Sequence, residues 1–401
     1  MLKRVVFLCS FLLSLLVSCT PQPKILSLVS DKSEMATAAA LFDAANDDVH
    51  VLFHHVSSLD ATLIKSLNPD IIVGDGLEAV EISSLLRPLP AQDTLYPTLE
   101  NLVQTNPRLH PLAFQAPLIM ANQETMAKID DPSTITVEMM EELGANHTIR
   151  NRSGRLTRLG FNPTWNPDFL TDFMDMNAPT LFTQGLEQVN EQILNNLALN
   201  LRDWVIRAAG DFDSAVAFDT RYRYVPDDVL LKNQQILFSR VSLATWSNLP
   251  DQVRNTLDVR YLRGNRTIPI TTLTSGGIPK GSKSSKFAQE FLNWLSLPAT
   301  QQTLMERWER DGTPTFGMLG GLSAQPAINE TILVEHVSWM APLVPEPRFF
   351  ALPAPRPHRW LRIRDELVQP WILSKIESPE NQSTIAEAYK QWDLSSLNLS
   401  E

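Results

Sequence analysis

Short apolar strands and amphipathic helices alternate along the first part of the chain, and this alternation constrains the fold most strongly. Residues 24–29 are typical of a buried strand, residues 30–33 of a helix start, and residues 34–45 of a helix. The same order then repeats as a strand over residues 50–56, a helix over residues 59–67 and a strand over residues 69–73. Strands separated in this way form a parallel sheet covered by helices, so we predict an α/β fold.

A basic start and an uncharged apolar run precede this region. Lys3 and Arg4 are followed by residues 5–17, which are apolar or small. A membrane-spanning helix needs about 20 such residues, so the shorter run favours a signal peptide. Residues 16–19, Leu-Val-Ser-Cys, resemble the bacterial lipobox. This implies a signal peptide over residues 1–18, lipidation of Cys19, and a lipidated N-terminus and tether over residues 19–23. The alternative is an ordinary signal peptide with an unrelated cysteine.

Cysteine usage agrees with lipidation. The chain has two cysteines, Cys9 and Cys19, and Cys9 lies in the expected signal peptide. The remaining chain would hold one cysteine and therefore no internal disulfide. Acyl chains on Cys19 would then be the only expected attachment to a lipid bilayer. We expect a membrane-anchored lipoprotein of the cell envelope, facing the periplasm or the extracellular space.

The balance of charge and the length narrow the class of protein further. Acidic residues outnumber basic ones, 45 against 34, for a formal net charge of −11. This balance argues against nucleic acid and anionic membrane surfaces as partners. A chain of 401 residues suits two domains or one bilobed body, at about 100–200 residues per domain. The cluster of prolines from Pro342 to Pro357 predicts an extended connection at the surface.

Four segments follow one another in the order and spacing of a known family. Residues 67–75 contain a Pro-Asp-Ile strand and its loop, and residues 85–89 a Leu-Leu element. Residues 275–283 form a strand-to-helix turn, in which Ser282, Ser284 or Ser285 is expected to cap the helix, and residues 287–302 form that helix and a turn with glutamines. Together they resemble the extracellular solute-binding proteins (family 1) of ABC transporters, most closely the carbohydrate-type branch.

This resemblance implies the two-lobed periplasmic binding protein fold (type II). Each lobe would be a mainly parallel sheet flanked by helices, and hinge strands would cross between the lobes. We expect residues 24–125 plus 260–320 in the first lobe and residues 126–259 plus 321–401 in the second. Residues 155–161 are a candidate crossing strand. The lobes would close over a small solute, because a solute that bridges both faces favours the closed state.

Two aspartates directly follow expected parallel strands. Asp31 comes after the first strand and Asp75 after the third, at the edge where open α/β sheets bind ligands. Charged side chains form strong hydrogen bonds with the hydroxyl groups of sugars, so we expect both aspartates to contact the solute. A helix cap or a turn former is the alternative for each. Gln115, after another expected strand, is a further candidate for a polar contact.

Sugar rings also need flat aromatic platforms, and the candidates are Trp165, Trp246 and Trp371. Trp165 follows the candidate crossing strand, with core packing as the alternative. Trp371 lies where the family has a C-terminal aromatic residue. Trp246 begins a Trp-Ser-Asn sequence similar to a motif of the maltose-binding branch. Ala244, however, replaces the tryptophan that the resemblance expects to stack on the sugar.

Common catalytic and metal-binding patterns are missing from the sequence. It contains no nucleophile elbow and no zinc-protease helix, so we expect no catalytic residue and no enzyme. The seven histidines are scattered, so no metal and no cofactor are expected. Tyr222 and Tyr224 could suggest iron, but a solvated cluster with neighbouring arginines is the simpler interpretation. Residues 281–283, Gly-Ser-Lys, have the wrong order for a phosphate-binding loop.

The resemblance therefore implies a monomeric substrate-binding lipoprotein of an ABC importer. It would capture a small solute, a sugar or oligosaccharide, between the lobes and deliver it to permease subunits in the membrane. The alternative is a protein that kept the fold, lost the transport ligand and serves as a surface scaffold or interaction lipoprotein. Ala244 and the scarcity of glycine in loops favour this alternative. An open, aromatic-lined cleft would favour binding, and a filled cleft would favour the scaffold.

Overall fold

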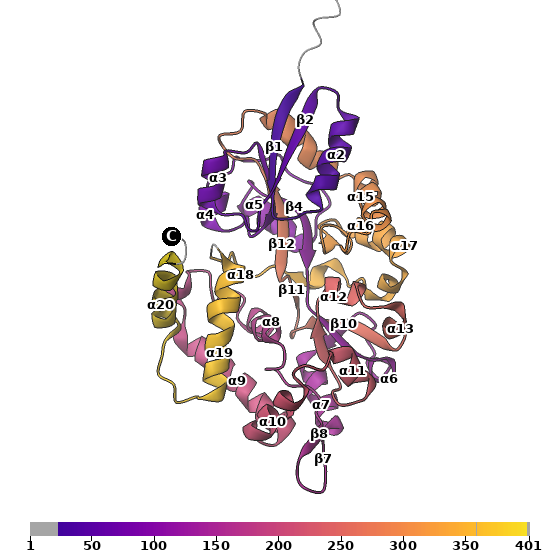
Figure 1. Ribbon diagram of the computed structural model, residues 1–401, viewed down its shortest axis with the longest axis vertical. Helices are drawn as coiled ribbons and strands as arrows, with labels where there is room; N and C mark the ends of the chain where they lie inside the picture. Colours follow the sequence, from indigo (N-terminus) through magenta and orange to yellow (C-terminus); the bar gives the residue numbers. More distant parts are fainter. Residues whose placement is uncertain (1–22, 358, 399–401) are drawn as a thin grey trace, which may run out of the picture.

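The computed structural model describes residues 23–357 and 359–398. The expected signal peptide, Cys19 and the tether up to residue 22 lie outside the described residues. No helix in the described ranges is both long and apolar enough to cross a membrane. Two main sheets occupy opposite halves of an elongated molecule (Figure 1), which we call the first and the second lobe.

The larger sheet belongs to the first lobe and has the strand order β13-β4-β12-β3-β1-β2. Its strands are β1 (Lys24–Ser30), β2 (Val49–His55), β3 (Ile71–Asp75), β4 (His110–Gln115), β12 (Thr272–Gly277) and β13 (Leu322–Ser323). β1 pairs in parallel with β2 and with β3, as the alternation of strands and helices predicted. β12 is antiparallel to both of its neighbours, and β13 is antiparallel to β4. The sheet is therefore mixed rather than mainly parallel.

Burial of apolar side chains explains the central strands of this sheet. Leu26, Leu28 and Val73 are inaccessible to solvent, as expected where helices cover both faces of a sheet. The helices of the first lobe are α2 (Met35–Ala45), α3 (Ala61–Leu67), α4 (Val80–Ser83), α5 (Pro97–Thr105), α14 (Ser285–Leu295) and α15 (Pro298–Arg310). The alternation predicted over residues 24–73 is confirmed, with small shifts of the element ends.

The smaller main sheet belongs to the second lobe and has the order β6-β10-β5-β9. Its strands are β5 (Leu118–Asn122), β6 (Thr134–Thr136), β9 (Ser239–Val241) and β10 (Leu257–Arg263). Its helices are α6 (Gln123–Met126), α7 (Val137–His147), α8 (Pro167–Asn177), η1 (Leu186–Gln188), α9 (Glu191–Ala209), α10 (Phe212–Tyr222), α11 (Asp227–Lys232), α12 (Leu243–Ser247) and α13 (Asp251–Arg254). Pro97, Pro167 and Pro298 each begin a helix, where the missing N–H of proline is harmless.

The chain passes between the two sheets at two neighbouring places. β4 ends at Gln115 and β5 begins at Leu118 in the other sheet, and the return runs from β10 through β11 (Ile268–Pro269) to β12. The first passage lies before residue 125, where we expected the lobe boundary, and the second lies after residue 260. Both shifts have one reason: β5 and β10 pair with each other, so both strands belong to the sheet of the second lobe. β13 belongs to the first sheet, although residues from 321 onward were expected in the second lobe.

The candidate crossing strand over residues 155–161 does not cross between the lobes. β8 (Leu156–Arg158) pairs with β7 (Ile149–Arg150), and their hairpin lies at the end of the molecule farthest from the first lobe (Figure 1). Gly154 has a φ of +80° in the turn between them, a conformation that suits glycine. A hairpin strand and a crossing strand are both extended, so a local sequence pattern does not distinguish them.

The last part of the chain covers both lobes. On the first lobe lie α16 (Pro326–Ile328), η2 (Asn329–Leu333) and α17 (Val334–His336), and on the second lie α18 (Trp360–Ile363), η5 (Arg364–Val368), α19 (Gln369–Glu377) and α20 (Ile385–Asn398). The connection between them was predicted to be extended, and the structure differs from this prediction. It contains the 3-10 helices η3 (Ser338–Leu343) and η4 (Pro347–Phe349), and then β14 (Phe350–Ala351), which pairs with β11. The φ that proline fixes is compatible with 3-10 geometry.

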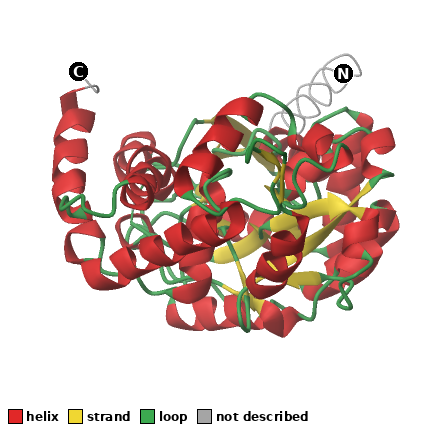
Figure 2. Cartoon of the chain, turned by 90° about the horizontal axis from the view of Figure 1, so that it is seen from below, coloured by secondary structure: helices red, strands yellow, loops and turns green. Residues whose placement is uncertain are grey.

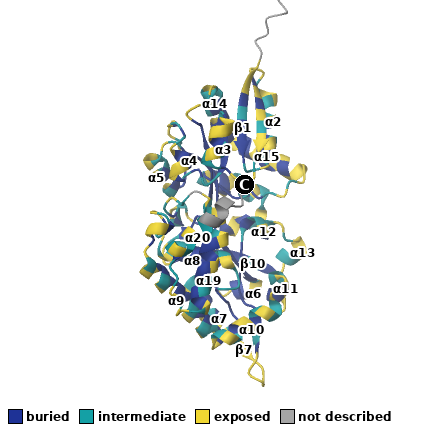
Figure 3. Cartoon of the chain, turned by 60° about the vertical axis from the view of Figure 1, so that its left-hand side comes forward, coloured by how far each residue is buried: buried dark blue, intermediate teal, exposed yellow. Residues whose placement is uncertain are grey.

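Two apolar cores stabilise the molecule. One core fills the first lobe and continues through Leu118 and Val259 into the sheet of the second lobe, so the lobes share packing where the chain crosses. The other lies beneath α8, α9 and α19 and includes Phe169, Trp204 and Ile372. Helices surround the strands (Figure 2), and exposed residues are concentrated on the outer surfaces (Figure 3).

Candidate functional site

A cavity of about 450 Å³ lies between the strand ends of the first lobe and the segment that leads into α18. We call it the inter-lobe cavity. Asp31 directly follows β1 and Asp75 ends β3, so the carboxyl ends of two parallel strands open into it. The first lobe contributes four acidic residues, the acidic wall: Asp31, Asp60, Asp75 and Glu78. The C-terminal segment contributes Trp360 and three arginines, the arginine wall: Arg356, Arg359 and Arg362. The volume suits a small-molecule ligand, for which about 300–1,000 Å³ is usual.

Asp75 is held at the centre of a polar network in the acidic wall. The Lys32 Nζ lies 2.5 Å from Asp75 Oδ2, and the Thr274 hydroxyl donates to Asp75 Oδ1 over 2.5 Å. The backbone N–H of Asp75 donates to Asp31 Oδ2 over 3.3 Å. Three strands thus meet here through side chains, because β12 runs antiparallel beside β3 and brings Thr274 opposite Asp75. These contacts fix the carboxylate of Asp75 in one orientation.

Asp31 approaches the backbone of β3 closely, and glycine makes that possible. A Cβ atom on Gly74 would lie 2.4 Å from Asp31 Oδ1, so a larger residue would push the carboxyl group away. Burial and the negative charge of Asp75 raise the pKa of Asp31 to about 6, although Lys32 opposes the shift. Asp31 therefore carries a proton more readily than an exposed aspartate, and its Oδ1 has no hydrogen-bond partner.

Glu78 is the second residue of this wall with a carboxyl oxygen that lacks a hydrogen-bond partner. The chain turns after β3 at Gly76, whose φ is +74°, and Glu78 follows shortly before α4. Burial raises the pKa of Glu78 to about 7, and its Oε2 is buried without a hydrogen-bond partner. A group with this pKa can either donate or accept a hydrogen bond near neutral pH.

The arginine wall places an aromatic ring and guanidinium groups opposite these carboxyl groups. Arg356 lies over the Trp360 ring, 4.4 Å from its centroid, and forms an ion pair with Asp175 of α8. Phe182 packs against Trp360 with ring centroids 4.9 Å apart. Trp360 is half-buried, so part of its ring is available to line the cavity. Rings and guanidinium groups stacked in this way form a pre-ordered surface.

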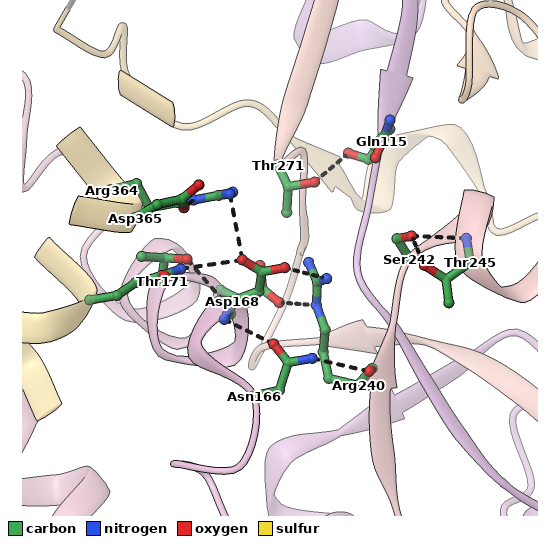
Figure 4. A network of polar contacts seen from close by, with 12 residues as sticks. Gln115, Asn166, Asp168, Thr171, Arg240, Ser242, Thr245, Thr271, Arg364 and Asp365 are labelled. Atoms are coloured by element: carbon green, nitrogen blue, oxygen red, sulfur yellow. Dashed lines mark hydrogen bonds and ion pairs between the residues drawn. The ribbon is translucent and has the colours of Figure 1, made fainter. Parts of the chain in front are cut away.

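A second cavity of about 390 Å³ lies in the second lobe, below the strand ends of the first. Figure 4 shows the charged network around Asp168 and Arg240 at this cavity, with Gln115 and Thr271 above it in that view. Arg240 forms ion pairs with Asp168 over 2.9 Å and with Asp172 over 3.0 Å. Burial raises the pKa of Asp172 to about 6, and Arg240 opposes this shift.

The residues expected to contact the solute fall into separate groups. The structure brings Asp31 and Asp75 together in the inter-lobe cavity. The side chain of Gln115 is half-buried and lines neither cavity, and its carbonyl accepts a hydrogen bond from the N–H of Thr271 (Figure 4). Trp165 is half-buried, and its indole N–H donates to Asp227 over 3.0 Å. Trp165 lines neither cavity.

Trp246 and Trp371 require a correction, because both are core residues. Trp246 is 3% exposed and packs edge-on against Trp339. Trp371 is 5% exposed and belongs to the core beneath α8 and α9. A tryptophan that is fully packed by protein atoms offers no ring face to a solute. Sequence similarity located these residues in the family pattern but could not show which side chains face the cleft.

Sequence reasoning missed the arginine wall. Trp360, Arg356 and Arg359 follow a proline-rich connection, which we interpreted only as a linker. The available signal was a cluster of basic and aromatic residues in an otherwise acidic chain. In the described ranges, no group of three or more His, Cys, Asp or Glu side chains could hold a metal ion. The site is therefore described by hydrogen-bonding groups, charges and one tryptophan.

Comparisons with known proteins agree with this architecture. No protein-family model and no curated protein matches the sequence. Among solved structures, CpMnBP1 with mannotriose bound is 14% identical, with a TM-score of 0.57, over 92% of this chain and 98% of that one. A sugar transporter from Rhizobium etli in an open conformation is 10% identical, with a TM-score of 0.59, over 91% and 97%. An ABC transporter solute-binding protein from Thermotoga lettingae bound with α-D-tagatose is 14% identical, with a TM-score of 0.53, over 92% and 97%.

The chain thus has the two-lobed α/β fold of the solute-binding proteins. These similar structures are of binding proteins and a transporter component rather than enzymes. In the present protein the inter-lobe cavity offers carboxyl groups, guanidinium groups and an aromatic ring, which are groups that bind polar ligands. The arrangement can accept and donate hydrogen bonds to a small polar molecule that enters between the lobes.

Proposed function

We propose that this protein is the substrate-binding component of an ABC importer and captures a sugar or oligosaccharide between its lobes. The observation that carries this proposal is the inter-lobe cavity of about 450 Å³, which Asp31, Asp75 and Trp360 line together. Carboxylates bind hydroxyl groups with charge-assisted hydrogen bonds, and an indole ring packs against the C–H face of a sugar. The sugar ligands named for CpMnBP1 and for the Thermotoga lettingae protein support the same class of solute.

Delivery to a permease and anchoring at a membrane belong to the same proposal. Residues 1–18 would direct export, and acyl chains on Cys19 would hold the protein, as a monomer, near permease subunits in the cell envelope. Labelling of expressing bacteria with a palmitate analogue tests the anchor. Label should enter the full-length protein and be absent from a Cys19→Ala variant.

The scaffold alternative predicts a cleft filled by protein atoms. The open volume and the half-buried Trp360 favour binding instead. Ala244, which stands where the resemblance expects a stacking tryptophan, is not among the residues that line this cavity. The aromatic surface of this cavity comes from the C-terminal segment.

Ligand binding is testable on the soluble body, residues 23–401. A thermal-shift screen against neutral, acidic and amino sugars should identify a stabilising solute, which at 100 times its dissociation constant adds about 2.7 kcal/mol. Asp75→Asn removes a charged acceptor and should weaken the binding of that solute about tenfold or more. Asp47→Asn, on an exposed loop, is the matched control. Failure of every saccharide to stabilise the protein would overturn the proposal in favour of the scaffold.

A further inference from the structure

Charge is segregated across the inter-lobe cavity, and this segregation narrows the class of solute. On the acidic wall, Lys32 neutralises Asp75 at 2.5 Å, and Asp60 is occupied as the cap of α3, where it accepts a hydrogen bond from the Leu63 N–H over 2.7 Å. Asp31 and Glu78 remain as hydrogen-bonding groups without a paired cation. The acidic wall is therefore less negative than its four carboxyl groups suggest.

Arg356 is a fixed donor on the opposite wall. Its guanidinium forms an ion pair with Asp175 and lies over the rings of Trp360 and Phe182, at 4.4 and 5.7 Å from their centroids. The side chain is 12% exposed, and its Nη1 is buried without a hydrogen-bond partner. A guanidinium that is held by three neighbouring side chains and has one unsatisfied nitrogen is pre-ordered to bind an oxyanion.

Arg359 supplies a positive charge beside Arg356. It lines the same cavity and is exposed, and in the described ranges no carboxylate forms an ion pair with it. The backbone of Arg359 has a φ of +60° immediately before α18, a conformation that non-glycine residues adopt uncommonly. Arg362, in contrast, pairs with Glu366 over 2.9 Å. The net positive charge of this wall therefore comes mainly from Arg359.

We propose that the solute is an anionic sugar, whose carboxylate or phosphate group is bound by Arg356 and Arg359 while its hydroxyl groups face Asp31, Asp75 and Glu78. This inference rests on the proposed function and names the charge of its substrate. A planar guanidinium matches the oxygens of a carboxylate or phosphate in pairs. The opposite orientation would place the anion against carboxyl groups and leave Arg359 without a counter-charge.

Calorimetric titration of the soluble body against matched sugars tests the proposal. The probes are glucose, galactose, glucosamine, glucuronate, galacturonate and glucose 6-phosphate. We expect an anionic probe to bind at least about tenfold more tightly than the neutral sugar with the same ring. Added salt should weaken the binding of the anionic probe and leave the binding of the neutral sugar unchanged. The uronate and phosphate arms distinguish the two sources of the oxyanion.

Arg359→Gln should weaken the binding of the anionic probe about tenfold and change the affinity for the neutral sugar by no more than about twofold. Because Arg359 is exposed, this variant should fold normally, which circular dichroism will check. Arg310→Gln, an exposed arginine of α15, is the control and should change neither affinity. Arg356→Lys keeps the charge but not the paired geometry, and should also weaken the anionic probe.

The outcomes separate the two proposals. Equal binding of glucose and glucuronate with no effect of Arg359→Gln, or tightest binding of glucosamine, would overturn the anionic-sugar inference and leave the sugar-binding function intact. Failure of every probe to bind, together with failure of every saccharide in the thermal-shift screen, would overturn the sugar-binding function itself. Preference for an anionic probe that disappears in Arg359→Gln would support both.

Discussion

Asp31 and Glu78 hold their protons more tightly than exposed carboxyl groups do. Burial and the charge of Asp75 raise the pKa of Asp31 to about 6, and burial raises the pKa of Glu78 to about 7. In the unfolded chain both groups return to their usual, lower values. The stabilisation from these protons is therefore fully present below about pH 4 and is lost as the pH rises through 6 and 7. Both carboxyl groups line the inter-lobe cavity, so the same titrations change its charge.

Glu78→Gln should remove part of this pH dependence. A neutral amide replaces the protonated carboxyl group, so the free energy of unfolding should fall less between pH 5 and pH 8 than in the unmodified protein. The pKa difference sets an upper limit of about 3 kcal/mol on the change. Urea denaturation at several pH values measures it, with Glu81→Gln at an exposed position of α4 as the control. Identical pH profiles for the Glu78→Gln variant and the unmodified protein would contradict this account.

Among the secondary-structure elements, the start of α14 shows how distant segments are tied together. We expected Ser282, Ser284 or Ser285 to cap this helix, but Ser284 at the N-cap makes no side-chain capping hydrogen bond. Asp70, just before β3, caps the helix instead. Its Oδ1 accepts hydrogen bonds from Ser282 Oγ and from the N–H groups of residues 283 and 284, at 2.9 to 3.0 Å.

Asp70→Ala should destabilise the protein by about 2–3 kcal/mol, because several hydrogen bonds to one carboxylate are lost together. Its Oδ2 also accepts from the Ser27 N–H over 3.2 Å, so the loss would affect β1 and α14 at once. Chemical denaturation gives the change in the free energy of unfolding. Asp48→Ala, on the exposed loop before β2, is the matched control and should stay within about 0.5 kcal/mol. A difference of similar size in both variants would show that Asp70 has no special role.

In the whole molecule, the C-terminal segment completes the cleft because charged side chains fasten it to α8. Asp168 and Asp175 project from that helix and pair with Arg364 and Arg356 of the segment. Burial raises the pKa of Asp175, although Arg356 opposes the shift. The segment thereby brings Trp360 and Arg359 opposite strand ends that lie more than two hundred residues earlier in the sequence.

Asp175→Asn should destabilise the protein by about 3–5 kcal/mol, because Arg356 would be left buried without a counter-charge. Thermal denaturation and limited proteolysis near residues 350–362 measure the loss. Replacing both partners, Asp175→Leu with Arg356→Met, should restore most of the stability, since no buried charge remains unpaired. If the double variant is as unstable as Asp175→Asn, packing rather than charge holds the segment.

Much of the first lobe could be predicted from local pattern. The alternation over residues 24–73 located β1, β2 and β3 with the helices between them, because strand and helix periodicities differ clearly there. The same pattern placed Asp31 and Asp75 at strand ends, where parallel order brings them together. The hairpin of β7 and β8 was mistaken for a crossing strand, because extended segments look alike until their partners are known.

Local sequence determined the α/β class and the acidic half of the cleft, since both depend on residues close together in the chain. Tertiary structure alone decided which tryptophan faces the cleft. Trp246 and Trp371 are packed inside while Trp360 lines the cavity, and no local pattern separates these environments. The arginine wall likewise depends on long-range contacts, since ion pairs with α8 and the packing of Trp360 on Phe182 hold a distant segment near the ends of β1 and β3. Such long-range contacts reflect the packing of the whole chain, which sequence spacing does not encode.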